Sequence, residues 1–240
     1  MNSTTDMVKR SSVIVKLAVG VSVIGTMVFG TPGMAQRTGK GEPNTSTITL
    51  RVYDYSHGGQ KALRAAEGEA ARILAQAGVI AHWTDCPTKH ADVEKYPGCT
   101  GAATGTEYTL LLLSSSMAAA QKSQDALGSA ADCEHGACIA RVYYDRIDRL
   151  AGGNSVPSYV LAGRVMAREV GQLLIGVTYR SRSGIMNASW THEQLGLLAS
   201  PEIVFSSTEA NAMRARLAEH EQAAAMHLAE TDTEQPKRSR

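Results

Sequence analysis

The chain has 240 residues, of which 43% are hydrophobic and 20% are charged, and its formal net charge is +1. This composition is sufficient for one domain with a sizeable core. The near-neutral charge gives no reason to expect binding to nucleic acid or to a membrane surface. We therefore expect a single folded domain that acts as a monomer.

Residues 1–35 have the pattern of a secretory signal peptide. Lys9 and Arg10 precede an apolar run from Val13 to Phe29, and Gly33-Met-Ala35 offers a small-x-small cleavage site. The alternative is an uncleaved anchor, because the run approaches the roughly 17 residues that can span a bilayer. The break at Pro32 favours cleavage after Ala35. The mature protein is then expected to be periplasmic or secreted, and free of the membrane.

The first half of the mature chain predicts a strand, a helix and two further strands. Residues 36–46 are expected to be flexible, and Ile48 to Tyr53 alternates apolar and polar side chains as a half-buried strand does. Gln60 to Ala77 is rich in helix-forming residues, and Val79 to Trp83 predicts a second strand. The continuous apolar run from Tyr108 to Leu113 is typical of a central strand covered on both faces.

The four cysteines are consistent with export, because an even number in an exported chain usually indicates disulfides. Of the three possible connectivities we prefer Cys86 with Cys99 and Cys133 with Cys138, since both pairs close short loops. The alternative is a metal cluster of Cys133, His135 and Cys138. That cluster lacks a fourth ligand and would compete with oxidation.

The second half predicts two short strands and a long helix. The strands are expected at Leu127 to Ala131 and at Ile139 to Tyr144. Pro157 begins a helix that reaches about Ile175 and ends at Gly176, which suits a left-handed C-terminal cap. Strands and helices thus alternate along the chain, which predicts an α/β domain.

A last helix is expected near the C-terminus. Ser206 and Glu209 form a capping box for it, and its apolar side reaches about Leu228. Residues 229–240 are polar and charged without periodicity, and we expect them to be disordered. The folded domain is therefore placed at 47–228.

The segment 168–186 resembles the zinc-binding helix and Met-turn of metzincin-type zinc metallopeptidases. The family pattern is H-E-x-x-H-x-x-G-x-x-H, followed by a turn that carries Met. With one more residue before the third histidine, its elements fall on Arg168, Glu169, Gln172, Gly176 and Arg180. Glu169, Gly176 and Met186 fit the pattern. The three ligand positions, Arg168, Gln172 and Arg180, do not hold histidine.

Four other segments extend the resemblance to a group of secreted bacterial proteins that are similar to metzincins. They are Ile48 to Tyr55, Trp83 to Pro87, Val142 to Arg146 and Gly184 to Trp190. The resemblance implies a mixed, mostly parallel five-stranded sheet with a long active-site-type helix, a Met-turn and a C-terminal helix. It also makes Leu127 to Ala131 a candidate for the edge strand that lines a substrate cleft, and Met186 a packing residue beneath the site.

The departures at the ligand positions remove the chemistry that this family needs. In the family, two histidines at i and i+4 face one ion, and the intervening Glu is the general base for the metal-bound water. Arg168 stays protonated and has no lone pair to offer, and the carboxamide of Gln172 is a poor zinc ligand. Arg180 would add a second fixed cation. We therefore predict neither zinc nor another cofactor, and we regard Glu169 as a vestigial general base.

The function we prefer on this basis is that of a non-catalytic binding protein, a pseudopeptidase whose cleft still accommodates a peptide or a protein. The competing hypothesis is an active metallopeptidase that uses other ligands around Glu169, such as His192. We also expect Arg168 or Arg180 to pair with Glu169 and the other guanidinium to hold an anion such as a peptide carboxylate.

Overall fold

The computed structural model describes residues 45–101, 103, 105–121, 125–131, 138–153, 156–187 and 200–233. The expected signal peptide, Cys133, His135 and His192 lie outside these residues. Across the described ranges, no helix combines the length and the apolar character that crossing a membrane requires.

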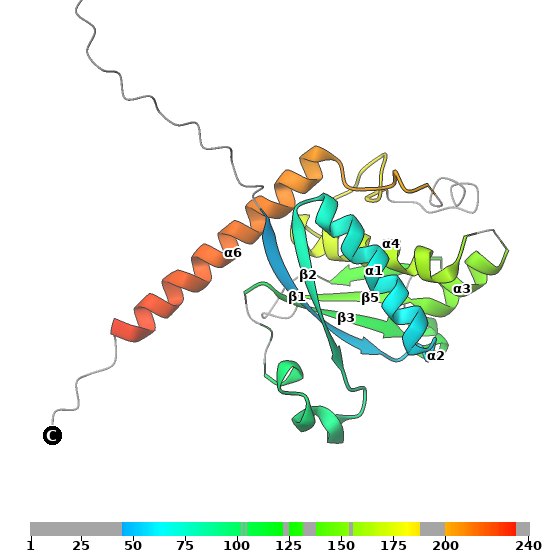
Figure 1. The fold of residues 1–240 in the computed structure, drawn as a ribbon, viewed down its shortest axis with the longest axis horizontal. Helices are drawn as coiled ribbons and strands as arrows, with labels where there is room; N and C mark the ends of the chain where they lie inside the picture. The colour runs from blue at the N-terminus through cyan, green and yellow to red at the C-terminus, as the bar shows by residue number, and fades with distance from the viewer. Residues whose placement is uncertain are drawn as a thin grey trace, which may run out of the picture. The chain divides into compact units, whose positions relative to one another are not determined.

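The domain is built on a five-stranded sheet with the strand order β2-β1-β3-β5-β4 (Figure 1). The strands are β1 Ser46–Asp54, β2 Val79–Cys86, β3 Glu107–Leu113, β4 Gly128–Ala131 and β5 Ile139–Tyr143. Neighbouring strands are parallel except β4 and β5, which makes β4 an antiparallel edge strand. The predicted α/β fold with a mixed, mostly parallel five-stranded sheet is confirmed.

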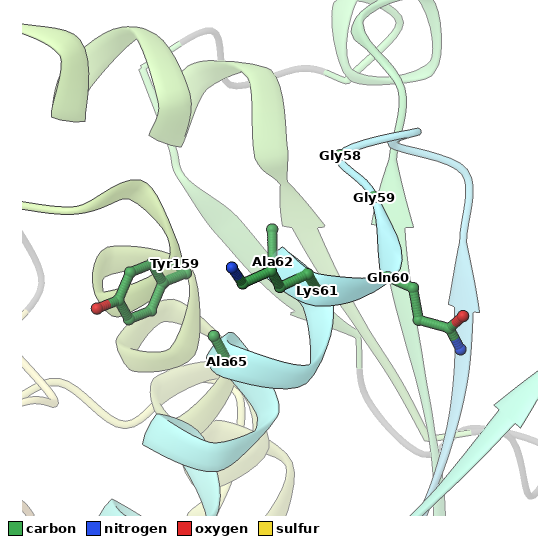
Figure 2. Close-up of a pocket in the computed structure, with 7 residues that line it drawn as sticks. All are labelled: Gly58, Gly59, Gln60, Lys61, Ala62, Ala65 and Tyr159. Atoms are coloured by element: carbon green, nitrogen blue, oxygen red, sulfur yellow. The ribbon is translucent and has the colours of Figure 1, made fainter.

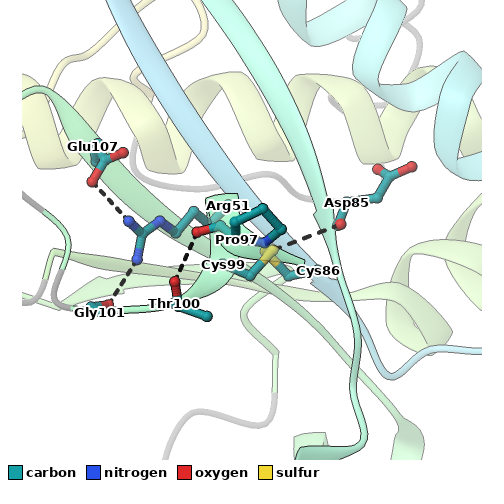
Figure 3. Close-up of a disulfide and its surroundings, with 8 residues drawn as sticks. All are labelled: Arg51, Asp85, Cys86, Pro97, Cys99, Thr100, Gly101 and Glu107. Carbon is teal, nitrogen blue, oxygen red and sulfur yellow. Dashed lines mark hydrogen bonds and ion pairs between the residues drawn. A yellow bond between two sulfur atoms is a disulfide. The ribbon is translucent and has the colours of Figure 1, made fainter. Parts of the chain in front are cut away.

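The inner strand β1 departs from the predicted half-buried pattern at Arg51. Leu50 and Val52 are each 1% exposed, but Arg51, on the opposite face, is only 7% exposed. Its guanidinium donates to Glu107 Oε2 of β3 and to the carbonyl of Gly101, each at 2.9 Å (Figure 3). The polar side chain of Arg51 is therefore buried in an ion pair instead of facing solvent.

A disulfide closes the loop that follows β2. Cys86 is bonded to Cys99, with 5.7 Å between the two Cα atoms (Figure 3). The loop contains two short 3-10 helices, His90–Lys95 and Pro97–Cys99. The predicted pairing of these two cysteines is confirmed. Cys138 is also disulfide-bonded. Its expected partner Cys133 lies outside the described residues, so that pairing stays a prediction.

Replacing both Cys86 and Cys99 by alanine should lower the free energy of unfolding by roughly 2 to 3 kcal/mol, because the crosslink restricts the unfolded chain. The sequence separation of 13 residues sets this magnitude. Chemical denaturation of the mature chain with and without the double substitution measures the difference. Equal denaturation midpoints would show that this crosslink does not stabilise the fold.

Two long helices pack on the sheet and on each other. They are α1 Gln60–Gln76 and α4 Ser158–Ile175, and α4 also contacts β4 and β5. Gly163 permits their close approach, because a Cβ at this position would lie 2.5 Å from the carbonyl oxygen of Ala66. Arg164 Nε donates to Glu69 Oε1 at 3.1 Å and adds a buried ion pair between the helices. Both predicted helices are confirmed.

The end of α4 differs from the prediction in its backbone conformation. Gly176 has φ 131° and ψ 134°, so its φ is positive but its ψ is extended and the cap is not left-handed helical. Glycine adopts this conformation without steric cost. The Gly176 N–H still closes the last helical hydrogen bond, to the carbonyl of Gln172 at 2.9 Å, and α4 ends at Ile175 as predicted.

Two shorter helices have no counterpart in the sequence predictions. They are α2 Ser115–Ala119 and α3 Tyr144–Gly152, so Tyr144 begins a helix instead of ending a strand. Arg146 connects them, because its guanidinium donates to the carbonyls of Ala118 at 2.6 Å and Ala126 at 2.8 Å. These contacts are remote in sequence, and local periodicity does not reveal them.

The C-terminal helix α6 spans Ser207–Thr233 and begins at the predicted capping box. The Ser206 N–H donates to Glu209 Oε2 at 2.7 Å, and the Glu209 N–H donates to Ser206 Oγ at 3.3 Å. The helix continues to Thr233 instead of ending near Leu228, since extending a formed helix adds one backbone hydrogen bond for each residue that it orders. Residues 229–233 are therefore helical and not disordered, and 234–240 lie outside the described residues.

Candidate functional site

The side chain of Glu169 lies between α4 and the edge strand β4. It is fully buried, with 0% of its surface exposed. Gly128 of β4 lies directly against it, because a Cβ at this glycine would be 2.8 Å from Glu169 Cγ and from Val165 Cγ1. A glycine in this strand thus allows the sheet to cover the carboxyl-bearing face of the helix.

Arg168 pairs with Glu169 and also contacts the turn that follows the helix. Its Nη1 donates to Glu169 Oε1 in a close ion pair, and its Nε donates to the carbonyl oxygen of Asn187 at 3.3 Å. The expectation that one guanidinium pairs with Glu169 is confirmed. The same guanidinium connects α4 to the turn.

Burial is the main influence on the pKa of Glu169. It raises the pKa of this carboxyl from 4.5 to about 6, although the charge and hydrogen bond of Arg168 and the charge of Arg180 lower it. Oε2 is buried and has no hydrogen-bond partner among the residues that the structure describes. The carboxyl group therefore changes between its neutral and ionised forms only slightly below neutral pH.

The other two ligand positions of the motif hold side chains of different kinds. Gln172 lies one turn after Arg168 on α4 and is 5% exposed. Arg180 is exposed, and its Nη1 donates to the carbonyls of Val177 at 2.7 Å and Tyr179 at 2.8 Å. Because its charge acts on Glu169, Arg180 belongs to the same electrostatic environment.

Met186 is a buried residue of the turn that follows α4. It is 0% exposed, and its Sδ is 3.2 Å from the position that a Cβ on Gly171 would take. Backbone bonds hold the turn, from the N–H of Ile185 to the carbonyl of Val204 and from the N–H of Ser181 to the carbonyl of Met186, each at 3.3 Å. Met186 is therefore a packing residue, as expected.

These side chains do not fit a zinc ion. Within the described ranges, no group of three or more His, Cys, Asp or Glu side chains is placed to hold a metal. At the motif itself, Arg168 donates a hydrogen bond to the Glu169 carboxylate. A guanidinium group has no lone pair with which to bind a metal. His192 falls outside the described part of the chain, so its role as a replacement ligand stays a prediction.

A pocket of about 740 Å³ lies at the start of α1, beside Tyr159 of α4 (Figure 2). Its lining residues are Gly58, Gly59, Gln60, Lys61, Ala62, Ala65 and Tyr159. The polar side chains of this lining are exposed, and Tyr159 has 41% of its surface accessible. Without a buried polar group to fix a ligand's orientation, this pocket is a weaker candidate than the α4 site.

Comparison with known proteins gives distant structural similarity alone. No family model and no curated protein matches the chain. Among solved structures, the fold is similar to the crystal structure of archaemetzincin (amzA) from Methanopyrus kandleri, with 11% sequence identity and a TM-score of 0.40. The match covers 72% of this chain and 96% of that chain. At this level the similarity does not assign the chain to a family.

Proposed function

We propose that the chain is an exported, non-catalytic binding protein with a metallopeptidase-like site in which an ion pair stands in place of the metal. The observation that carries this proposal is the contact between Arg168 and the buried carboxylate of Glu169. A guanidinium supplies positive charge, but it accepts no lone pair from a water molecule or a carbonyl and so does not act as a Lewis acid.

The geometry of Glu169 argues against a role as general base. A general base must reach the proton that it removes, directly or through one water molecule. Glu169 is fully buried, Arg168 is bound to its Oε1, and its Oε2 is enclosed by protein. The pair is better suited to hold α4 against the turn at Asn187 than to activate a nucleophile.

Two features support a peptide or protein as the partner. The edge strand β4 consists of Gly-Ser-Ala-Ala, and an edge strand offers unpaired backbone groups to which an extended peptide can bind as an added strand. The exposed guanidinium of Arg180, which two backbone carbonyls anchor, is suited to bind a peptide carboxylate.

Export is supported by the signal-peptide pattern of 1–35 and by the Cys86–Cys99 disulfide.

The purified mature chain is expected to contain far less than one zinc ion per molecule and to cleave no peptide. Elemental analysis after mild dialysis measures the metal, and a mixed peptide library measures hydrolysis, with Glu169→Gln as the control. About one tightly held zinc per chain would overturn the proposal if it came with cleavage that both a chelator and Glu169→Gln abolish. Other ligands, His192 first among them, would then have to hold the metal.

A further inference from the structure

Two carboxyl groups approach each other between α1 and the end of β2. Glu67 of α1 is 4% exposed, and Asp85 precedes the disulfide-bonded Cys86. Glu67 Oε1 and Asp85 Oδ1 are both buried, and neither accepts a hydrogen bond from the described residues. Two buried oxygens without a donor would each destabilise the fold, so the arrangement requires an explanation.

A proton shared by the two groups provides that explanation. Arg64 binds Asp85 and lies one turn before Glu67 on the same face of α1, which places the Glu67 carboxyl beside Asp85. Two ionised carboxylates only accept hydrogen bonds, whereas a protonated carboxyl group donates one to its neighbour. A single proton therefore satisfies both oxygens, and the repulsion between two adjacent negative charges favours its retention.

The surrounding charges place this proton on Glu67. Asp85 Oδ2 already accepts a hydrogen bond from Arg64 Nη2 at 2.7 Å, whereas no hydrogen bond from a cation to Glu67 is present among the described residues. Burial and then the charge of Asp85 raise the pKa of Glu67 from 4.5 to about 7; Asp54 of β1 also raises it, while Arg64 lowers it. On α4, which also packs on α1, Arg164 pairs with Glu69 instead.

The position of the pair indicates what it holds together. Asp85 lies where β2 passes into the disulfide-closed loop, so its contact with Glu67 ties this strand end to α1. A pocket of about 270 Å³, lined by Asp54, Asp85 and Cys86 among other residues, lies beside it. The pair therefore borders this pocket through Asp85.

We propose that Glu67 and Asp85 form a proton-sharing carboxyl pair that fastens the end of β2 to α1, and that loss of the shared proton loosens this attachment. The proton passes to solvent and leaves two neighbouring carboxylates with the single guanidinium of Arg64. The folded chain binds this proton more tightly than the unfolded chain, in which a glutamate titrates near 4.5. The contribution to stability is therefore complete below about pH 4.5 and is lost as the pH rises to about 7.

Amide hydrogen exchange of the full mature chain tests the proposal. After correction for the intrinsic effect of pH, exchange in β2 should accelerate about tenfold or more between about pH 5 and pH 8. Glu67→Gln, whose amide donates to Asp85 without titrating, should abolish this acceleration. Glu219→Gln, in an exposed ion pair with Arg216 on α6, is the matched control and should leave the acceleration unchanged.

A direct titration keeps the proposal testable even if Glu67→Gln does not fold. The carboxyl carbon of Glu67, followed by NMR in the unsubstituted chain, should titrate near neutral pH. Titration near 4.5, the ordinary value, would overturn the proposal. So would an acceleration of exchange in Glu67→Gln equal to that of the unsubstituted chain.

Discussion

Replacing Arg168 by methionine is expected to lower the free energy of unfolding by about 3 to 5 kcal/mol at alkaline pH. Methionine retains much of the apolar stem, so the principal loss is that of the guanidinium. Glu169, which is fully buried, then carries an uncompensated charge, and the bond from Arg168 Nε to the carbonyl of Asn187 is also removed. Urea denaturation of both proteins measures the difference.

The size of this loss should depend on pH. The pKa of Glu169 is about 6 with Arg168 in place, and removing the guanidinium should raise it further, since the guanidinium lowers it by its charge and by a hydrogen bond. Below the pKa of the parent the carboxyl is neutral in both proteins. The loss should therefore be small at about pH 5 and should grow to its full value above the pKa of the variant.

The same substitution in an exposed pair provides the control. Arg216 and Glu219 of α6 form an ion pair at 3.2 Å, and their side chains are 57% and 64% exposed. Arg216→Met should change the free energy of unfolding by less than about 1 kcal/mol, because solvent screens such pairs. If Arg168→Met is no more destabilising than Arg216→Met at alkaline pH, the buried pair does not stabilise the site as proposed.

The sheet could be predicted from the sequence because its signals are local. The apolar run from Tyr108 to Leu113 indicates a strand buried on both faces, and β3 occupies that central position. The helix from Gln60 stops before Gly78, whose φ of 77° suits glycine, so the boundary was visible in the sequence.

Buried polar contacts between distant segments could not be predicted in this way. Arg164 is 3% exposed because it pairs with Glu69, which lies 95 positions away in the sequence. The contact of Arg146 with the carbonyl of Ala118, which ties α3 to α2, spans 28 positions. The spacing of residues on one helix contains no information about such partners.

At the candidate site, too, the sequence predicted the residues of the motif but not their contacts with distant segments. The resemblance located Arg168, Glu169 and Met186, and the chemistry of arginine indicated why zinc does not fit. The sequence did not decide whether Arg168 or Arg180 pairs with Glu169. Neighbours at i and i+1 do not normally face each other on a helix. The contact of Arg168 with Asn187 in the turn, and the packing of Gly128 on Glu169, accompany this unusual pairing, and both partners are distant in sequence.

A triple substitution should convert the site into one that binds zinc. Arg168→His, Gln172→His and Arg180→His together remove two fixed cations and should place three imidazoles around one point, with Glu169 near the fourth, water-occupied position. We expect zinc to bind at least about a hundredfold more tightly than to the parent, with little or no peptidase turnover. We expect only weak to moderate affinity, because the loss of partners that orient each imidazole typically weakens binding by roughly 10- to 100-fold.

Replacing the same three residues by alanine gives the matched control. This variant loses the two cations without gaining imidazoles, so it separates relief of electrostatic repulsion from true coordination. It should bind zinc no more tightly than the parent. Circular dichroism of both variants verifies that the helix α4 is retained before their affinities are compared.

Calorimetric titration with zinc tests most directly whether this site is a metallopeptidase-like site without its ligands. The account predicts saturable binding of about one zinc per chain by the folded triple-histidine variant, and no saturable binding by the parent or the triple-alanine variant. A well-folded triple-histidine variant that binds zinc no better than the parent would contradict the assignment of Arg168, Gln172 and Arg180 to the three ligand positions.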